Sequence, residues 1–80
     1  MKINITAFGI AKEIIGNQSV TFDFPENSNV SEVKKKLIMA YPGFEKLATF
    51  AIAVNAEYAT DQQILSENDE VVIIPPVSGG

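Results

Sequence analysis

Cysteine, histidine and tryptophan are all absent from this chain of 80 residues. Without cysteine there is no disulfide framework, no thiolate zinc site and no cysteine nucleophile. Without histidine the chain lacks the commonest general base near neutral pH and the commonest metal ligand. A phosphate-binding loop of the type G-x-x-x-x-G-K-[S/T] is also missing. We therefore expect no autonomous active site and no metal centre.

Long apolar runs and an excess of positive charge are missing as well. The apolar runs fall far short of the roughly 20 residues that span a bilayer. The opening residues M-K-I-N-I alternate as a strand does, unlike the apolar core of a signal peptide. The formal net charge is -4, which argues against nucleic acid and favours a basic protein surface as partner. We expect a cytoplasmic protein that binds neither membrane nor nucleic acid.

The patterning that is present fits one small globular domain. Hydrophobic residues make up 46% of the chain, which is enough for a single core. Residues 2–8 and 18–24 alternate apolar with polar side chains, which predicts two half-buried strands paired antiparallel. Residues 10–15 between them fit one short helical turn.

The clearest helix is predicted over residues 29–41. Asn29 is a good N-cap, and Glu32 stands three places on, as in a capping box. Pro42 and Gly43 end the helix. Helical spacing places five side chains on its inner face, namely Val30, Val33, Leu37, Ala40 and Tyr41.

Two mostly apolar segments, residues 50–54 and 70–74, predict the remaining long strands. A short strand is expected at Tyr58, and residues 64–65 are expected to pack inward. Asn68 is the expected left-handed residue of the turn before the last strand. One helix against one mixed sheet is an α+β arrangement.

If Val71 and Ile73 face the helix, Val72 and Ile74 face the other side of the sheet. One helix covers one face only, so Ile74 is expected to be exposed unless a partner covers it.

The chain ends on P-P-V-S-G-G, although glycine contributes nothing to a core. Two prolines favour an extended stalk, and six extended residues reach about 20 Å. We expect a domain over residues 1–74 and a flexible tail over residues 75–80 that carries the terminal carboxylate into another protein. A carboxylate must be activated before it can carry a group, for example as an acyl adenylate that a partner makes with ATP. The alternative is that the Gly-Gly end arises by chance or by trimming.

Three segments of the chain match a known family. They are D-E-V-V-I-I-P-P-V-S-G-G at residues 69–80, A-F-G-I-A-K-E at residues 7–13 and A-V-N at residues 53–55. With them the chain resembles the MoaD/ThiS family of ubiquitin-like, β-grasp sulfur carriers, and within it the small subunits of molybdopterin synthase. Two positions depart from the family pattern: Asn68 replaces a common glycine, and Lys12 replaces a common arginine.

The resemblance implies a sulfur-transfer cycle at the last residue. An adenylyltransferase of the MoeB type would adenylate the Gly80 carboxylate with ATP, and a sulfur donor would convert it to a thiocarboxylate. The tail would then enter a MoaE-like large subunit, in a heterotetramer, and give its sulfur to cyclic pyranopterin monophosphate during molybdenum cofactor biosynthesis. The chain would be no enzyme alone and would bind no cofactor. The resemblance implies that Gly79 and Gly80 form the reacting terminus. The implied contact residues are Phe8, Tyr58, Ile74, Pro75, Pro76, Val77 and Ser78.

Other interpretations stay open at this point. A carrier for thiamine thiazole synthesis would use the same chemistry with another acceptor, although such carriers tend to lack the Pro-Pro stalk. A protein modifier or a plain β-grasp interaction module would use no sulfur chemistry. The apolar contact residues could be ordinary core or isolated surface side chains. The acidic residues Glu67, Asp69 and Glu70 form either a solvated turn or, less in keeping with their spacing, a metal site.

Overall fold

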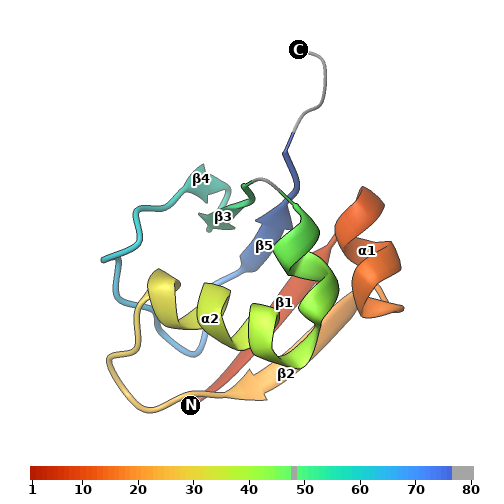
Figure 1. Ribbon diagram of the computed structural model, residues 1–80. Coiled ribbons are helices and arrows are strands. Elements are labelled where there is room, and N and C mark those ends of the chain that lie inside the picture. Colours follow the sequence, from red (N-terminus) through yellow and green to blue (C-terminus); the bar gives the residue numbers. More distant parts are fainter. Residues whose placement is uncertain (48, 77–80) are drawn as a thin grey trace.

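The first and last strands of the chain run parallel to each other in the middle of one mixed sheet (Figure 1). They are β1 (Lys2–Ala7) and β5 (Val71–Ile74) in a computed structural model that describes residues 1–47 and 49–76. β2 (Ser19–Asp23) pairs antiparallel with β1, and β3 (Ala51–Val54) pairs antiparallel with β5. The short β4 (Glu57–Tyr58) closes the order β2-β1-β5-β3-β4. The α+β class with a mixed sheet is confirmed.

The alternating pattern of the first strand places its apolar side chains under the main helix. Ile3, Ile5 and Ala7 are buried, and the residues between them face the other side of the sheet. The helical turn expected after this strand is α1 (Gly9–Ile15), which ends at Gly16 in the left-handed conformation, with φ 81°. Both predictions are confirmed.

The main helix, α2 (Val30–Ala40), covers one face of the sheet. The Asn29 side chain accepts a hydrogen bond of 3.1 Å from the backbone N–H of Glu32, so the predicted N-cap is confirmed. Val30, Val33 and Leu37 are fully buried.

The predicted inner face of this helix is wrong at Ala40, which is exposed at the margin of the buried stripe. Tyr41, predicted on the same face, is half-buried and packs against the core. The chain then enters a short 3-10 helix, η1 (Pro42–Lys46), whose Phe44 is buried and lies 6.4 Å from the Tyr41 ring.

The turn between β3 and β4 holds two residues in the left-handed region. Asn55 has φ 53° and Ala56 has φ 71°, the combination that a tight hairpin turn of the primed type requires. The Asn55 side chain donates to the Asp69 carboxylate and accepts from the Glu70 N–H, both at 2.9 Å. These bonds tie the hairpin to the start of β5.

The prediction of a left-handed Asn68 is wrong, since in the described part of the chain the non-glycine residues with positive φ are Asn27, Asn55 and Ala56. The turn before β5 closes through Asp69 instead. Its N–H donates to the Ser66 carbonyl at 3.0 Å, and its carboxylate accepts from the Ser66 N–H at 2.7 Å. An aspartate side chain that bonds the backbone in this way stabilises a turn without a left-handed residue.

The inward packing predicted for residues 64–65 holds for one residue only. Leu65 is buried, whereas Ile64 is 53% exposed. Ile64 forms an isolated bridge with Asn29, and the Leu65 N–H donates to the Ser28 carbonyl. Successive side chains of an extended segment point in opposite directions, so the two cannot both face the core.

The helices within the described residues are short. Neither stretch of the chain, 1–47 or 49–76, contains a helix whose length and hydropathy match a bilayer crossing.

Candidate functional site

The sheet has one face under α2 and one open face. On β5, Val71 and Ile73 are fully buried on the helix side, while Val72 and Ile74 point to the open face and are half-buried. This alternation was predicted from the sequence and is confirmed. The open face is therefore where the last strand presents apolar side chains before the tail begins.

Strand register decides which side chains meet on the open face. Ala53 lies between Val72 on one side and Tyr58 on the other, and Ala51 lies beside Ile74. Paired residues in a sheet share a face. Alanine is short, so Ala51 leaves space beside the larger side chain of Ile74, whereas Ala53 is buried between its two neighbours.

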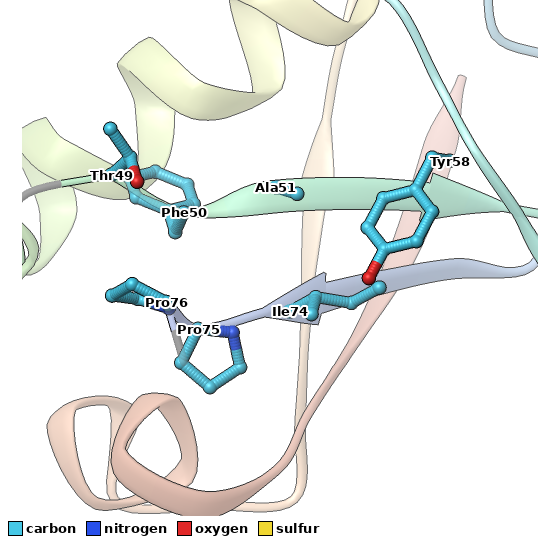
Figure 2. Close-up of a pocket in the computed structure, with 7 residues that line it drawn as sticks. All are labelled: Thr49, Phe50, Ala51, Tyr58, Ile74, Pro75 and Pro76. Atoms are coloured by element: carbon cyan, nitrogen blue, oxygen red, sulfur yellow. The ribbon is translucent and has the colours of Figure 1, made fainter. Parts of the chain in front are cut away.

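A hollow of about 270 Å³ occupies this space at the base of the tail (Figure 2). Figure 2 shows the Tyr58 ring directed toward Ile74 on one side, with Phe50 and Thr49 on the other side. We call this feature the tail-base hollow. Its lining carries no ionised side chain, in a chain whose net charge is -4. It is lined by Thr49, Phe50, Ala51, Tyr58, Ile74, Pro75 and Pro76.

Four of the expected contact residues line the tail-base hollow. Tyr58 is 74% exposed, and Ile74 and Pro75 are half-buried, next to the exposed Pro76. Ile74 was expected to be exposed on an uncovered face, but its neighbours in the hollow shield part of it.

Phe8 lies outside the hollow, on its other flank. It is 59% exposed, and its backbone is extended, with φ -130° and ψ 159°. The parallel pairing of β1 with β5 ends at Ala7 opposite Ile73. One step further along both strands, Phe8 comes level with Ile74. The apolar surface thus continues from the hollow across Ile74 to Phe8.

The rest of the expected site lies outside the described residues. These positions are Val77, Ser78, Gly79 and Gly80. β5 ends at Ile74, and the division into a domain over residues 1–74 and a flexible tail over residues 75–80 stays a prediction.

The sequence reasoning missed three residues of the hollow, namely Thr49, Phe50 and Ala51. A signal for them exists in the third strand. Ile52 and Val54 are large and buried, whereas the alternate positions of the strand, 51 and 53, are alanines. In a strand of period two, small residues on one face indicate either a close neighbour or a depression on that face.

Toward the β2 edge, the open face of the sheet is polar rather than apolar. Thr21 and Asn4 are exposed neighbours there, and the Thr21 hydroxyl donates to the Asn4 side-chain oxygen at 3.1 Å. The uncharged apolar surface is thus confined to the half of the face from which the tail leaves. The polar residues that β1 and β2 contribute to the open face are Lys2, Asn4, Thr6, Ser19, Thr21 and Asp23.

The acidic side chains before β5 accept hydrogen bonds that stabilise the turn leading into this strand. The Glu67 carboxylate accepts from the Lys2 N–H at 3.1 Å, and the Asp69 carboxylate binds Ser66 and Asn55. Within residues 1–47 and 49–76, no three acidic side chains come close enough together to hold a metal ion.

Known proteins resemble this chain over nearly its whole length. The ThiS family matches residues 5–80. The molybdopterin synthase sulfur carrier subunit of Dictyostelium discoideum is 41% identical over 83 residues, covering 99% of this chain and 96% of the relative. The protein of the same name from Arabidopsis thaliana is 33% identical over 81 residues, covering all of this chain and 84% of the relative.

Solved structures share the fold at lower identity. A putative molybdopterin converting factor subunit 1 from Pyrococcus furiosus has a TM-score of 0.87 at 22% identity, over 96% of this chain and 99% of that one. The Caldiarchaeum subterraneum ubiquitin has a TM-score of 0.67 at 22% identity, over 100% and 98%. A complex of subunits 1 and 2 of the Helicobacter pylori molybdopterin-converting factor gives 0.69 at 23% identity, over the whole of both chains. The predicted ubiquitin-like β-grasp fold is confirmed. The chain belongs to the ThiS family, in the group of the molybdopterin synthase sulfur carrier subunits.

Proposed function

We propose that this protein is the sulfur-carrying small subunit of molybdopterin synthase and that it carries the sulfur at the Gly80 carboxylate. One observation supports this most: β5 passes from the middle of the sheet directly into Pro75 and Pro76, beside an uncharged hollow. A tail that starts at such a docking surface enters a partner in a fixed direction. The curated relatives carry the same function in their names.

The chemistry requires activation of a poor electrophile. A partner transfers AMP from ATP to the Gly80 carboxylate, and pyrophosphate leaves. Hydrosulfide then attacks the acyl carbon and displaces AMP, which leaves a thiocarboxylate. With a persulfide donor the product is first an acyl disulfide, which a thiol reduces to the thiocarboxylate. The chain itself has no cysteine, so it cannot hold the sulfur as its own persulfide. When the sulfur passes to cyclic pyranopterin monophosphate, water hydrolyses the bond between the acyl carbon and the sulfur, and the terminus returns to a carboxylate.

Two proteins share the tail in this cycle. One is a MoeB-like adenylyltransferase related to ubiquitin-activating enzymes, and the other is a MoaE-like large subunit that holds the pterin. The small subunit is no enzyme by itself, because it supplies the sulfur while a partner supplies the rest of the active site. We further propose a heterotetramer of two small and two large subunits in the cytoplasm.

Docking on either partner would use the tail-base hollow and the adjoining Phe8. Apolar side chains at the centre of an interface contribute most of its affinity, and aromatic ones more than others. Tyr58 and Phe8 are large, exposed and uncharged, so a partner that covers them removes apolar area from water.

The test begins with the intact mass of the protein purified from its own cells. The proposal expects a species in which one oxygen is replaced by sulfur, and expects that species to be absent after deletion of Gly80. The thiolated form should then convert cyclic pyranopterin monophosphate to molybdopterin when mixed with the large subunit, and the unmodified form should not.

Each other outcome points to another function. Thiolation with transfer only to a thiazole precursor would make the protein a thiamine carrier. Attachment of Gly80 to lysines of other proteins, without thiolation, would make it a modifier. A mass that stays unmodified after incubation with ATP, activating enzyme and a sulfur source would refute the carrier function.

A further inference from the structure

The free edge of β2 has an unused row of backbone hydrogen-bonding groups. Two hydrogen bonds lie at the ends of the pairing between β1 and β2. The Ala7 N–H donates to the Gln18 carbonyl and the Phe24 N–H donates to the Met1 carbonyl, both at 2.8 Å. Residues of an antiparallel strand alternate between facing the partner strand and facing away. Even-numbered residues of β2 therefore bond β1, and the backbone groups of Ser19, Thr21 and Asp23 point away from the sheet.

Apart from the charged Asp23, this edge has little of the usual protection against pairing. β2 contains no proline or glycine, and its register to β1 continues over five residue pairs without a bulge. No backbone group of Ser19, Thr21 or Asp23 takes part in a hydrogen bond outside the ladder among residues 1–47 and 49–76. All three residues are exposed. The opposite edge of the sheet is β4, which has only two residues.

We propose that a second copy of this chain pairs with β2, antiparallel, about a two-fold axis at Thr21. In that register Thr21 faces Thr21 of the second copy, and Ser19 faces its Asp23. Each of these pairs exchanges N–H and carbonyl groups in both directions, so the whole free row is satisfied. An isologous contact needs a self-complementary surface, and this strand supplies one.

The side chains favour the same register. On the helix side of the sheet, Val20 comes to lie beside Phe22 of the second copy, and both side chains are only half-buried in one chain. An aromatic residue opposite a β-branched one is a favourable cross-strand pair. The only charge in the strand, Asp23, faces an uncharged serine, so no like charges are opposed.

The pairing leaves the tail-base hollow free. The hollow lies over β3, β4 and the end of β5, whereas β2 is the other edge of the sheet. A two-fold axis normal to the sheet sends the two tails to opposite ends of the combined sheet. Each copy can therefore bind its own partner while the pair stays intact.

The contact is small, because one short strand from each copy forms it. Small interfaces are weak, so we expect a dissociation constant on the order of 100 µM. The dimer is thus expected to appear only at high protein concentration.

Sedimentation velocity from about 10 µM to about 1 mM tests the proposal. The wild type should shift from monomer to dimer. Thr21→Lys places two ammonium groups opposite each other and should weaken association about five- to tenfold. Asn4→Lys is the matched control, because it adds the same charge, loses the same hydrogen bond to Thr21 and lies on an interior strand. It should dimerise as the wild type does.

One further measurement identifies the register of the dimer, and a second variant covers the case in which the first does not fold. In a mixture of labelled and unlabelled protein, an NOE between the α-protons of Val20 in one copy and Phe22 in the other identifies the register. If Thr21→Lys fails to fold, Thr21→Pro replaces it, since proline is tolerated where the N–H points off an edge. A wild type that stays monomeric to about 1 mM overturns the proposal. So does a dimer that Thr21→Lys leaves unchanged, or one that is lost on deletion of residues 77–80.

Discussion

Replacing Ala56 by glycine should stabilise this protein, although the same change in a strand or helix normally destabilises. Ala56 has φ 71° in the turn between β3 and β4. The left-handed conformation costs a residue with a Cβ roughly 1–2 kcal/mol. Glycine removes that cost but gives back about 0.4–1 kcal/mol, because it adds entropy to the unfolded chain. The net expectation is a gain of about 0.5–1 kcal/mol, which raises the Tm of a domain of this size by roughly 2–8 °C.

Thermal and urea unfolding of purified protein, followed by circular dichroism, measure the change. Ala59→Gly is the matched control, because Ala59 has negative φ and its N–H donates to the Ile52 carbonyl at 2.9 Å. That variant should lose about 0.5–1 kcal/mol. The reasoning is refuted if Ala56→Gly lowers the Tm, or if the two variants change stability in the same direction.

Three further outcomes are expected. Tyr58→Ala should change stability by less than about 0.5 kcal/mol and weaken binding to the large subunit about tenfold in calorimetry; unchanged affinity would contradict docking at the tail-base hollow. Leu37→Ala should cost about 2–5 kcal/mol in urea unfolding, while Met39→Ala, at a side chain 80% exposed, should cost less than about 0.5; equal losses would contradict the assignment of the buried face. Asn29→Ala should cost about 1 kcal/mol. Asn29→Ser should restore most of it, because a hydroxyl also accepts from the Glu32 N–H, and a serine variant as unstable as the alanine variant would count against the cap.

Local chemistry along the chain was enough to predict most elements. Alternation over residues 2–8 predicted a strand, and Asn29 with the apolar spacing behind it predicted the main helix. Both signals act between residues close in sequence, so a single chain shows them. The resemblance at residues 69–80 pointed to the family that the comparisons show.

Where local rules failed, a longer-range partner decided the outcome. Asn68 was a reasonable left-handed residue, but the Asp69 carboxylate closes that turn, and Asn55 is held by bonds from residues fourteen and fifteen places away. Ile64 and Leu65 are both apolar, and their backbone pairing with Ser28 and Asn29 determines which of them faces the core.

The sequence by itself determined most of the elements, including an apolar last strand, and the family to which the chain belongs. Only the tertiary structure decided that β5 inserts between β1 and β3, that Tyr58 and Ile74 share one hollow, and that β2 is left with a free edge. The physical reason is that strand order and register are set by pairings between distant segments. Those pairings determine which side chains become neighbours, and the pattern within one segment carries no record of them.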